Sequence, residues 1–543
     1  MEKSLFVFTH HGVPVFPVGL QSHNSSACSA DELCLAFRAV EICHCNSLAV
    51  PVYWEQVEPR EGKYEFEYLE GILRTARESH IYLFLVWFGT WKNGCMKYVP
   101  SWIKSDPQKY WRVIAGDGTP LPVLSPSCEN TRKADQRAFG KLMEYLRKAD
   151  EKENTVLAVQ VENEAGIMGA VRDFSSQSEK EFQASVPLDL YEKMKKYPDS
   201  PVSRCWSENG GEFGNWNAVF GNFAAEYFNA YKTACYMDSI AYAGKQKYSL
   251  PIYMNVQVDQ YKWRIPGYNY PSGGAVEKTL DLWKWYAPNI DLIAPDIYLW
   301  DSRAYEKCCQ TYARADNPLF IPESGPNESA SRYLFEAVGR YGAIGYFLFG
   351  AEGILLQSGE LDPVFSHIVG SLRSLSAIAP VWHKYRGNVL TGVVNQMEYM
   401  AVQRIDFTDY IALISFIAEQ PEAGGTDSDW NWQDHRHREY RQNIREEKRR
   451  GRGLIIQVEK QKFLALGDAY RVVFVPRCLL GENLPSIVSS EYLLCRSAEY
   501  LSVEEGYFDN DGIFQCTKKR NGDESDFGIW VQPDIGVVKV RLG

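Results

Sequence analysis

Short apolar runs alternate with longer polar segments along residues 13–353, and this alternation limits the fold more than any other feature of the chain. The segments between the runs have helical spacing, as at 135–149, where Phe139, Leu142, Met143 and Leu146 recur between charged neighbours. Near-continuous apolar strands are typical of parallel sheets that helices cover on both faces. The pattern therefore predicts an α/β fold built as a closed (β/α)8 barrel, or TIM barrel. The eight predicted strands are 13–20, 47–53, 81–88, 156–162, 251–257, 290–297, 318–322 and 343–349.

Two features refine this prediction. A doubly wound dinucleotide-binding sheet also alternates strands and helices, but no Gly-x-Gly-x-x-Gly follows the first predicted strand. About 85 residues separate the fourth and fifth strands, and they include an amphipathic stretch at 216–246. We expect this insertion to extend the rim of a pocket.

Near residue 376 the pattern of apolar residues changes from continuous runs to alternation. This change predicts a catalytic barrel over 1–375 and a second domain over 376–543. Alternating apolar and polar residues in the second part predict an antiparallel β-sandwich-like domain. Between its strands, the polar segment 418–452 contains Trp430 and Trp432 and ends in an arginine-rich run; it predicts a mobile loop. The alternating runs are 399–405, 410–417, 453–460, 470–476 and 536–542.

Composition narrows the classes of partner. A net charge of −11 and a pI near 5.5 argue against nucleic-acid binding, which needs a basic surface. No run reaches the 18 apolar residues of a membrane span, and the first apolar run is too short for a signal peptide, so we expect no membrane partner and a cytoplasmic location. The 13 cysteines include no Cys-x-x-Cys pair, and we expect reduced thiols and no metal.

Two glutamates stand at the ends of predicted strands, where barrel enzymes carry their active sites. The fourth strand ends in Glu162-Asn163-Glu164, and the seventh ends in Pro322-Glu323. Glycoside hydrolysis needs one carboxyl that donates a proton and a second that attacks as an anion. Either glutamate alone also fits a solvated rim residue or a charge in the first turn of a helix. Strand alternation places Glu162 on the same side as Glu164 but deeper, where it fits a structural carboxylate.

The motif Val-Gln-Val-Glu-Asn-Glu at 159–164, with Pro-Glu at 322–323, resembles the clan of retaining β-glycosidase barrels and is most similar to the β-galactosidases of glycoside hydrolase family 35. The resemblance implies that Glu164 is the acid/base and Glu323 the nucleophile. Pro51 and Thr90 stand where typical members place a Tyr and a Glu that hold the galactosyl ring, which weakens the case for galactose. Further similar segments, some shared with a bacterial subgroup that has an uncharacterised C-terminal β-domain, are 54–55, 57–66, 100–102, 22–26, 87–94, 294–298, 503–506 and 520–524.

Polar and aromatic residues at other strand ends are candidates to bind the sugar. We expect Asn163 to bond the sugar 2-hydroxyl and Tyr298 to donate to Glu323. Each of these residues also fits a core position, and Glu352 also fits an ion pair on the rim. The remaining candidate substrate-binding residues are His23, Asn24, Trp54, Glu55, Trp91, Asn255, Trp300 and Glu352.

Together these features predict a retaining exo-β-glycosidase, in the first place a β-galactosidase, that acts on a glycoside or oligosaccharide without metal or organic cofactor. One alternative is the same reaction on another β-linked sugar, such as a glucoside, mannoside or arabinoside. Another is a carbohydrate-binding barrel without catalysis. A metal-dependent hydrolase would need ligands on several strand ends, where only His23 is well placed. The oligomeric state, a homo-oligomer included, stays open.

Overall fold

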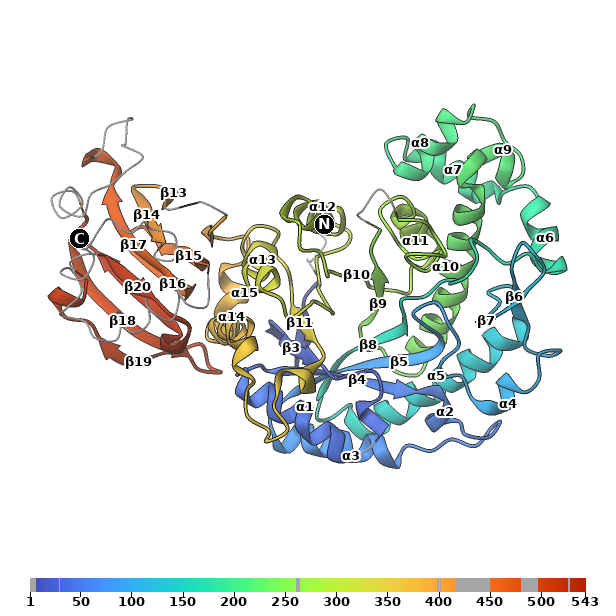
Figure 1. Ribbon diagram of the computed structural model, residues 1–543, viewed down its shortest axis with the longest axis horizontal. Helices are drawn as coiled ribbons and strands as arrows, with labels where there is room; N and C mark the ends of the chain where they lie inside the picture. Colours follow the sequence, from blue (N-terminus) through green and yellow to red (C-terminus); the bar gives the residue numbers. More distant parts are fainter. Residues whose placement is uncertain are drawn as a thin grey trace.

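The computed structural model describes residues 6–28, 30–259, 264–397, 400, 402–416, 450–479, 497–525 and 528–543. A barrel surrounded by helices lies beside a β-rich C-terminal part, and the two follow one another along the long axis of the molecule (Figure 1). The loop predicted at 418–452 lies outside the described residues except for its last three, and Trp430 and Trp432 lie outside them too.

Seven parallel strands form most of the barrel, in the spatial order β10-β9-β8-β5-β4-β3-β11. Residues 320–324 fill the eighth place, because parallel bridges join Ile321 to Tyr346 and Ser324 to Ile297. This closure confirms the predicted (β/α)8 fold, although the predicted strand 318–322 makes only single bridges. The strands are β3 (Val18–Gln21), β4 (Ser47–Tyr53), β5 (Tyr82–Lys92), β8 (Val156–Asn163), β9 (Ile252–Gln257), β10 (Leu292–Asp296) and β11 (Tyr346–Phe349), and the first predicted strand also contains β2 (Val13–Val15), which pairs with β1 (Phe8–His10).

Helices cover the outside of the barrel because each presents one apolar stripe to the strands. In α5, Phe139, Leu142 and Leu146 are buried, while Lys141 and Lys148 form ion pairs with Glu144 on the exposed face. The covering helices are α1 (Ala30–Ile42), α3 (Glu67–Glu78), α5 (Glu129–Asp150), α10 (Ala224–Lys245), α11 (Leu280–Tyr286), α12 (Ser302–Tyr312), α13 (Glu328–Gly339) and α14 (Ser366–Ser376).

The long insertion after β8 forms four short helices beside one end of α10 (Figure 1). Three of them begin at a side-chain cap: Ser175, Ser200 and Asn215 each accept a hydrogen bond from a main-chain N–H of the first helical turn. The four helices are α6 (Ser176–Gln183), α7 (Leu188–Lys196), α8 (Pro201–Glu208) and α9 (Trp216–Phe220).

Two antiparallel sheets make up the C-terminal part and confirm the predicted sandwich-like fold. Phe463 and Phe474 lie between the sheets with ring centroids 4.5 Å apart. The six-stranded sheet contains β12 (Leu390–Asn395), β15 (Arg452–Glu459), β16 (Lys462–Asp468), β21 (Val537–Leu542), β18 (Tyr500–Phe508) and β19 (Phe514–Lys519). The four-stranded sheet contains β13 (Val402–Asp406), β14 (Tyr410–Phe416), β17 (Tyr470–Pro476) and β20 (Ile529–Val531).

A fully buried arginine joins the two parts. Arg452 of β15 donates to Asp468 over 2.6 Å, and on α14 to the Ser371 hydroxyl over 2.8 Å and to the main-chain oxygen of His367 over 2.9 Å. The predicted boundary at 375/376 falls at the end of α14, and the first strand of the sandwich begins at Leu390. Because α14 contacts both parts, the exact boundary stays a prediction.

No single helix within the described ranges is long and apolar enough to cross a membrane, although α14 with its preceding turn and α15 (Ala379–Tyr385), bent by 62°, together meet that criterion by length and composition. The cysteines in the described part of the chain are all free thiols.

We predict that Arg452→Met lowers the free energy of unfolding by about 3–5 kcal/mol, because it leaves the Asp468 carboxylate buried without its partner. The matched control is Arg404→Met, which breaks the exposed pair with Asp406 and should cost at most about 1 kcal/mol. Urea unfolding of both variants measures the difference. Equal midpoints for the two variants would show that the buried pair does not stabilise the junction.

Candidate active site

Glu323 lies at the C-terminal end of the seventh barrel strand and accepts hydrogen bonds on both carboxylate oxygens. Gln21 donates to Oε1 over 2.8 Å, and the Tyr298 hydroxyl donates to Oε2 over 2.9 Å. The amides of Asn163 and Asn255 make longer contacts with Oε1, at 3.4 and 3.5 Å. Donors from four different strand ends therefore hold the side chain and stabilise its ionised form.

Glu164 follows β8 and has a different environment. Its Oε2 accepts a hydrogen bond of 2.6 Å from the Asn93 amide, and its main-chain N–H donates to Asn255 Oδ1 over 2.8 Å. Burial, and then the charge of Glu323, raise the pKa of Glu164 to about 7. Both glutamates have an exposed fraction of 6%. Glu164 can therefore carry a proton near neutral pH, as a general acid must.

A third carboxyl and one ammonium complete a group that we call the carboxylate cluster: Glu164, Asp296, Glu323 and Lys92. Asp296 ends β10 and accepts a 2.7 Å hydrogen bond from Asn255. Burial, and then the charges of Glu323 and Glu164, raise the pKa of Asp296 well above its ordinary value. The pKa of Lys92 is lowered, because the effect of burial outweighs that of the three carboxylates, which raise it.

Glu162 points away from this cluster, contrary to the side expected from strand alternation. Its φ of 58° and that of Glu164, 44°, lie in the left-handed region, so the chain between them does not alternate as a regular strand does. Glu162 instead accepts a hydrogen bond from the main-chain N–H of Trp91 and lies against Asp135 of α5. The prediction of a structural carboxylate bonded to a neighbouring strand fits this position.

Three of the predicted binding residues, Asn163, Asn255 and Tyr298, reach the carboxylate cluster. Asn163 and Asn255 have almost no exposed surface, and their amides contact the cluster itself. Tyr298 is 43% exposed and donates to Glu323 as expected. Burial and the Glu323 charge raise the pKa of Tyr298, so its hydroxyl keeps the proton that it donates.

Other predicted residues lie on the rim. The main-chain N–H of His23 donates to Glu352 Oε2 over 3.0 Å, so Glu352 bonds the first strand end rather than an arginine. The main-chain oxygen of Asn24 accepts from the Tyr98 hydroxyl, and Glu55 pairs with Lys104 at 3.4 Å. Trp300 is 70% exposed after β10.

The side chains of Trp54 and Trp91 make their contacts away from the carboxylate cluster, and their role in binding a sugar stays a prediction. The Trp54 ring donates to Glu58 over 3.0 Å and packs against Trp87 and Trp102. The Trp91 ring lies 4.7 Å from that of Tyr236 on α10. Both side chains are fully buried. Trp54 begins the short helix α2 (Trp54–Val57) after β4, and Trp91 lies on β5, where side chains point outward as often as inward.

Sequence analysis missed four residues of the site: Gln21, Lys92, Asn93 and Asp296. Gln21 and Asp296 stand at the ends of the predicted strands 13–20 and 290–297, whereas Lys92 and Asn93 lie beyond the predicted strand 81–88, because β5 continues to Lys92. His23, two residues after Gln21, and Trp91, one residue before Lys92, were predicted instead. Among the described residues, no group of three or more His, Cys, Asp or Glu side chains could hold a metal ion.

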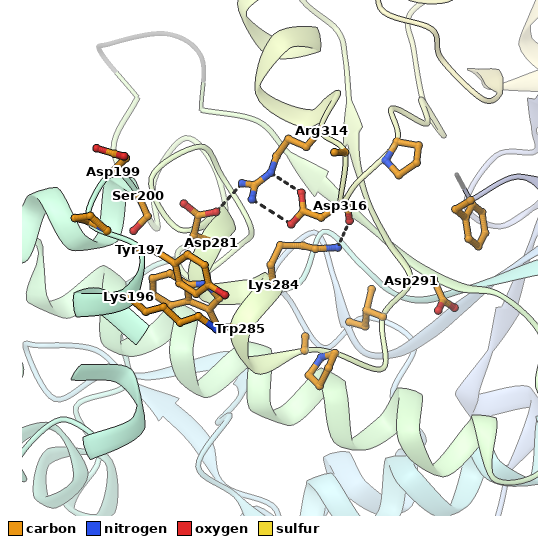
Figure 2. Close-up of a pocket in the computed structure, with 17 residues that line it drawn as sticks. Lys196, Tyr197, Asp199, Ser200, Asp281, Lys284, Trp285, Asp291, Arg314 and Asp316 are labelled. Atoms are coloured by element: carbon orange, nitrogen blue, oxygen red, sulfur yellow. Dashed lines mark hydrogen bonds and ion pairs between the residues drawn. The ribbon is translucent and has the colours of Figure 1, made fainter. Parts of the chain in front are cut away.

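A pocket of about 920 Å³ lies elsewhere in the molecule (Figure 2). It is lined by residues 196–200 after α7, by α11 and the residues that follow it, and by 314–318. Figure 2 shows Arg314 between Asp281 and Asp316, with which it forms ion pairs of 2.6 and 2.8 Å. Because residues 287–291 precede β10, this pocket lies toward the N-terminal ends of the strands, whereas barrel active sites lie at the C-terminal ends.

Comparisons with known proteins agree with the class that the barrel and its two glutamates define. Residues 31–220 match the model of the family described as Beta-galactosidase, glycoside hydrolase family 42. This part of the barrel is thus similar to a family of β-glycosidase barrels. The matching model is that of family 42, and the match does not support the expected family 35. Residues 370–532 match a domain of unknown function, DUF5597.

Solved structures with a similar fold include two β-galactosidases. The cold-adapted enzyme from Rahnella sp. R3 is 16% identical, with a TM-score of 0.48 over 70% of this chain and 58% of that one. The enzyme from Bacillus circulans sp. alkalophilus is 15% identical, with a TM-score of 0.48 over 69% and 57%. The catalytic domain of β-amylase from Paenibacillus polymyxa is 14% identical, with a TM-score of 0.48 over 66% and 98%. This chain thus spans less than two thirds of either β-galactosidase, and no curated protein matches it.

We predict that Glu162→Gln makes the protein at least as stable as the wild type at about pH 8 and reduces the loss of stability between about pH 5 and about pH 8. Burial, and then the Asp135 charge, raise the pKa of Glu162 well above its ordinary value. The folded state therefore binds more protons than the unfolded state above the ordinary pKa of a glutamate, and stability falls as pH rises.

Glutamine keeps an oxygen for the Trp91 N–H and offers a donor to Asp135. Thermal unfolding across this pH range measures the effect, with the exposed Glu151→Gln as control. A Glu162→Gln variant that loses stability with pH as steeply as the control would contradict a shared proton between Glu162 and Asp135.

Proposed function

We propose that the protein is a retaining exo-β-glycosidase, and specifically a β-galactosidase, that hydrolyses terminal β-linked sugars by double displacement. One observation carries this proposal: two buried glutamates at the ends of the fourth and seventh strands have opposite environments. Glu323 accepts from Gln21, Tyr298 and two asparagine amides, whereas Glu164 accepts from Asn93 and shares a hydrogen bond with the Asp296 carboxyl. In such a pair one carboxyl, here Glu164, can act as the acid and the other, here Glu323, as the attacking anion.

In the first step, Glu164 protonates the glycosidic oxygen while Glu323 attacks the anomeric carbon. The leaving group departs with the proton of Glu164, and a covalent glycosyl-enzyme forms on Glu323. In the second step, ionised Glu164 takes a proton from water, which attacks the same carbon and releases Glu323. Two inversions retain the β configuration, and Glu164 recovers its proton.

The donors around Glu323 have a role in this cycle. Tyr298 and Gln21 hold its two oxygens, so the carboxylate keeps one orientation for attack. Because Asn255 accepts the main-chain N–H of Glu164 and donates to Asp296, it fixes the acid relative to the third carboxyl. The exposed rings of Tyr298 and Trp300 offer apolar surface at the mouth for a sugar or an aglycone.

The match to a family described as Beta-galactosidase supports a galactoside as substrate. Thr90, which stands where family 35 members hold the galactosyl ring with a Glu, faces outward in this chain and bonds Asp135 and Tyr236 over 2.7 Å. The residues of the carboxylate cluster and its amides, rather than Thr90, would therefore recognise the sugar hydroxyls.

The experiment that tests this function measures nitrophenol release from nitrophenyl β- and α-glycosides by the wild type, Glu164→Gln and Glu323→Gln. We expect cleavage of the β-galactoside alone, with kcat lowered by about 10²–10⁴ in Glu164→Gln, because general acid catalysis is lost. We expect a loss of about 10⁴-fold or more in Glu323→Gln, because the nucleophile is lost.

The wild-type kcat/KM should fall as pH rises through about 7, the pKa of Glu164, since the acid must be protonated. The surface variant Glu144→Gln serves as control and should keep the wild-type rate. Undiminished turnover in Glu323→Gln, or no cleavage of any glycoside by the folded wild type, would refute the proposed mechanism or the proposed activity respectively.

A further inference from the structure

Lys92 is an unusual residue to find among three carboxyls at the mouth of the barrel. It is the last residue of β5 and only 5% exposed, and within the described part of the chain its ammonium donates to no carboxylate. It donates instead to two amide oxygens: over 2.8 Å to Asn163 Oδ1, and to Asn93 Oδ1. The positive charge thus lies near the carboxylates, but its hydrogen bonds go to Asn93 and Asn163.

The NH₂ groups of the two amides face different glutamates. An asparagine whose oxygen is held by an ammonium must turn its NH₂ group the other way. Asn93 Nδ2 accordingly donates to Glu164 Oε2 over 2.6 Å, and Asn163 Nδ2 contacts Glu323 Oε1 at 3.4 Å. A flipped Asn93 would place two oxygens against each other at Glu164 and an NH₂ group against the ammonium.

The backbone supports this arrangement. Asn93 has a φ of 53°, in the left-handed region, and its main-chain N–H donates to the Asn163 oxygen over 3.1 Å. Gly94 in turn donates to the main-chain oxygen of Glu164 over 3.1 Å. The turn after β5 is therefore bonded to the strand end that carries Glu164, and Lys92 and Asn93 have fixed positions relative to it.

We propose that Lys92 is a positioning residue: by holding the oxygens of Asn93 and Asn163, it turns one amide donor toward Glu164 and one toward Glu323 and so couples the orientation of the acid to that of the nucleophile. This inference rests on the proposed function and adds to it the residue that fixes the orientations of Glu164 and Glu323 relative to each other. The other charged groups that face Glu164 are Glu323, Asp296 and Arg264.

The test compares Lys92→Met with wild type and with Lys97→Met, which removes the charge of an exposed lysine five residues along the same segment. Two β-galactosides are used, one with a 4-nitrophenol leaving group and one with 2,4-dinitrophenol, which departs with little help from an acid. In Lys92→Met we expect kcat to fall by about 100-fold on both substrates, with KM changed by less than about 3-fold, because donors aimed at both glutamates are lost.

The pH profile separates positioning from a general loss of structure. The Lys92 charge lowers the pKa of Glu164, so its removal should move the alkaline limb of kcat/KM upward by roughly one pH unit. Lys97→Met should keep the wild-type kcat and limb. A kcat loss in Lys92→Met with an unmoved limb, or a wild-type kcat, would overturn the proposal.

Asn93→Gly decides the matter if Lys92→Met does not fold, since glycine accepts a φ of 53° without strain. It removes the donor to Glu164 and one acceptor of Lys92, but it leaves the Asn163 contacts with Lys92 and Glu323 in place. The kcat loss should therefore be about 10-fold greater for the 4-nitrophenyl than for the 2,4-dinitrophenyl substrate. Equal losses on both substrates would overturn the proposal. A folded wild type inactive on every glycoside would refute the proposed function itself, whereas an active wild type with these variant results would refute the role of Lys92 alone.

Discussion

Burial of three carboxyl groups within one hydrogen-bonded network is the constraint on which the rest of the site depends. Glu164, Asp296 and Glu323 lie at the ends of different strands, where each ionised group costs free energy unless donors or a counter-charge compensate it. Amides from Gln21, Asn163 and Asn255 and the Tyr298 hydroxyl supply the donors, and Lys92 supplies the charge. Burial, and then the charge of Glu323, raise the pKa of Glu164 to about 7, while the amides and the Tyr298 hydroxyl fix the position of Glu323.

The barrel makes this arrangement possible because it brings consecutive strand ends into one ring. Gln21, Lys92, Asn163 and Asp296 end β3, β5, β8 and β10, and Asn255 lies near the end of β9. Glu323 closes the ring through the main-chain bond from Ile297 N–H to its oxygen. The left-handed backbone at Glu162 and Glu164 turns one glutamate outward to Asp135 and the other inward. Hydrogen bonds of Glu162 with the Trp91 N–H and of Glu164 with Asn255 stabilise this strained backbone.

Periodicity in the sequence predicted most of the fold, because buried parallel strands have few polar residues and their helices have one apolar face. It predicted 318–322 as a full strand, yet this segment closes the barrel with single bridges. Whether a segment pairs continuously or at single residues depends on the strands beside it, which periodicity does not describe. Strand-end position also identified Glu164 and Glu323. It did not identify Gln21, Lys92 or Asp296, because whether a strand-end side chain faces the mouth or the helices depends on local twist and on bulges. The β5–β8 register contains such shifts between Trp87 and Lys92.

The central claim is that Glu323 forms the covalent bond to the sugar. Incubation with a 2-deoxy-2-fluoro-β-galactoside that carries a 2,4-dinitrophenol leaving group should form the glycosyl-enzyme quickly and hydrolyse it slowly, because the fluorine disfavours both transition states but the good leaving group offsets this only in the first. Mass spectrometry of the intact protein followed by peptide mapping locates the label. The account predicts one sugar per chain on the peptide that contains Glu323. A label on Glu164 or Asp296, or steady turnover without any labelled protein, would contradict it.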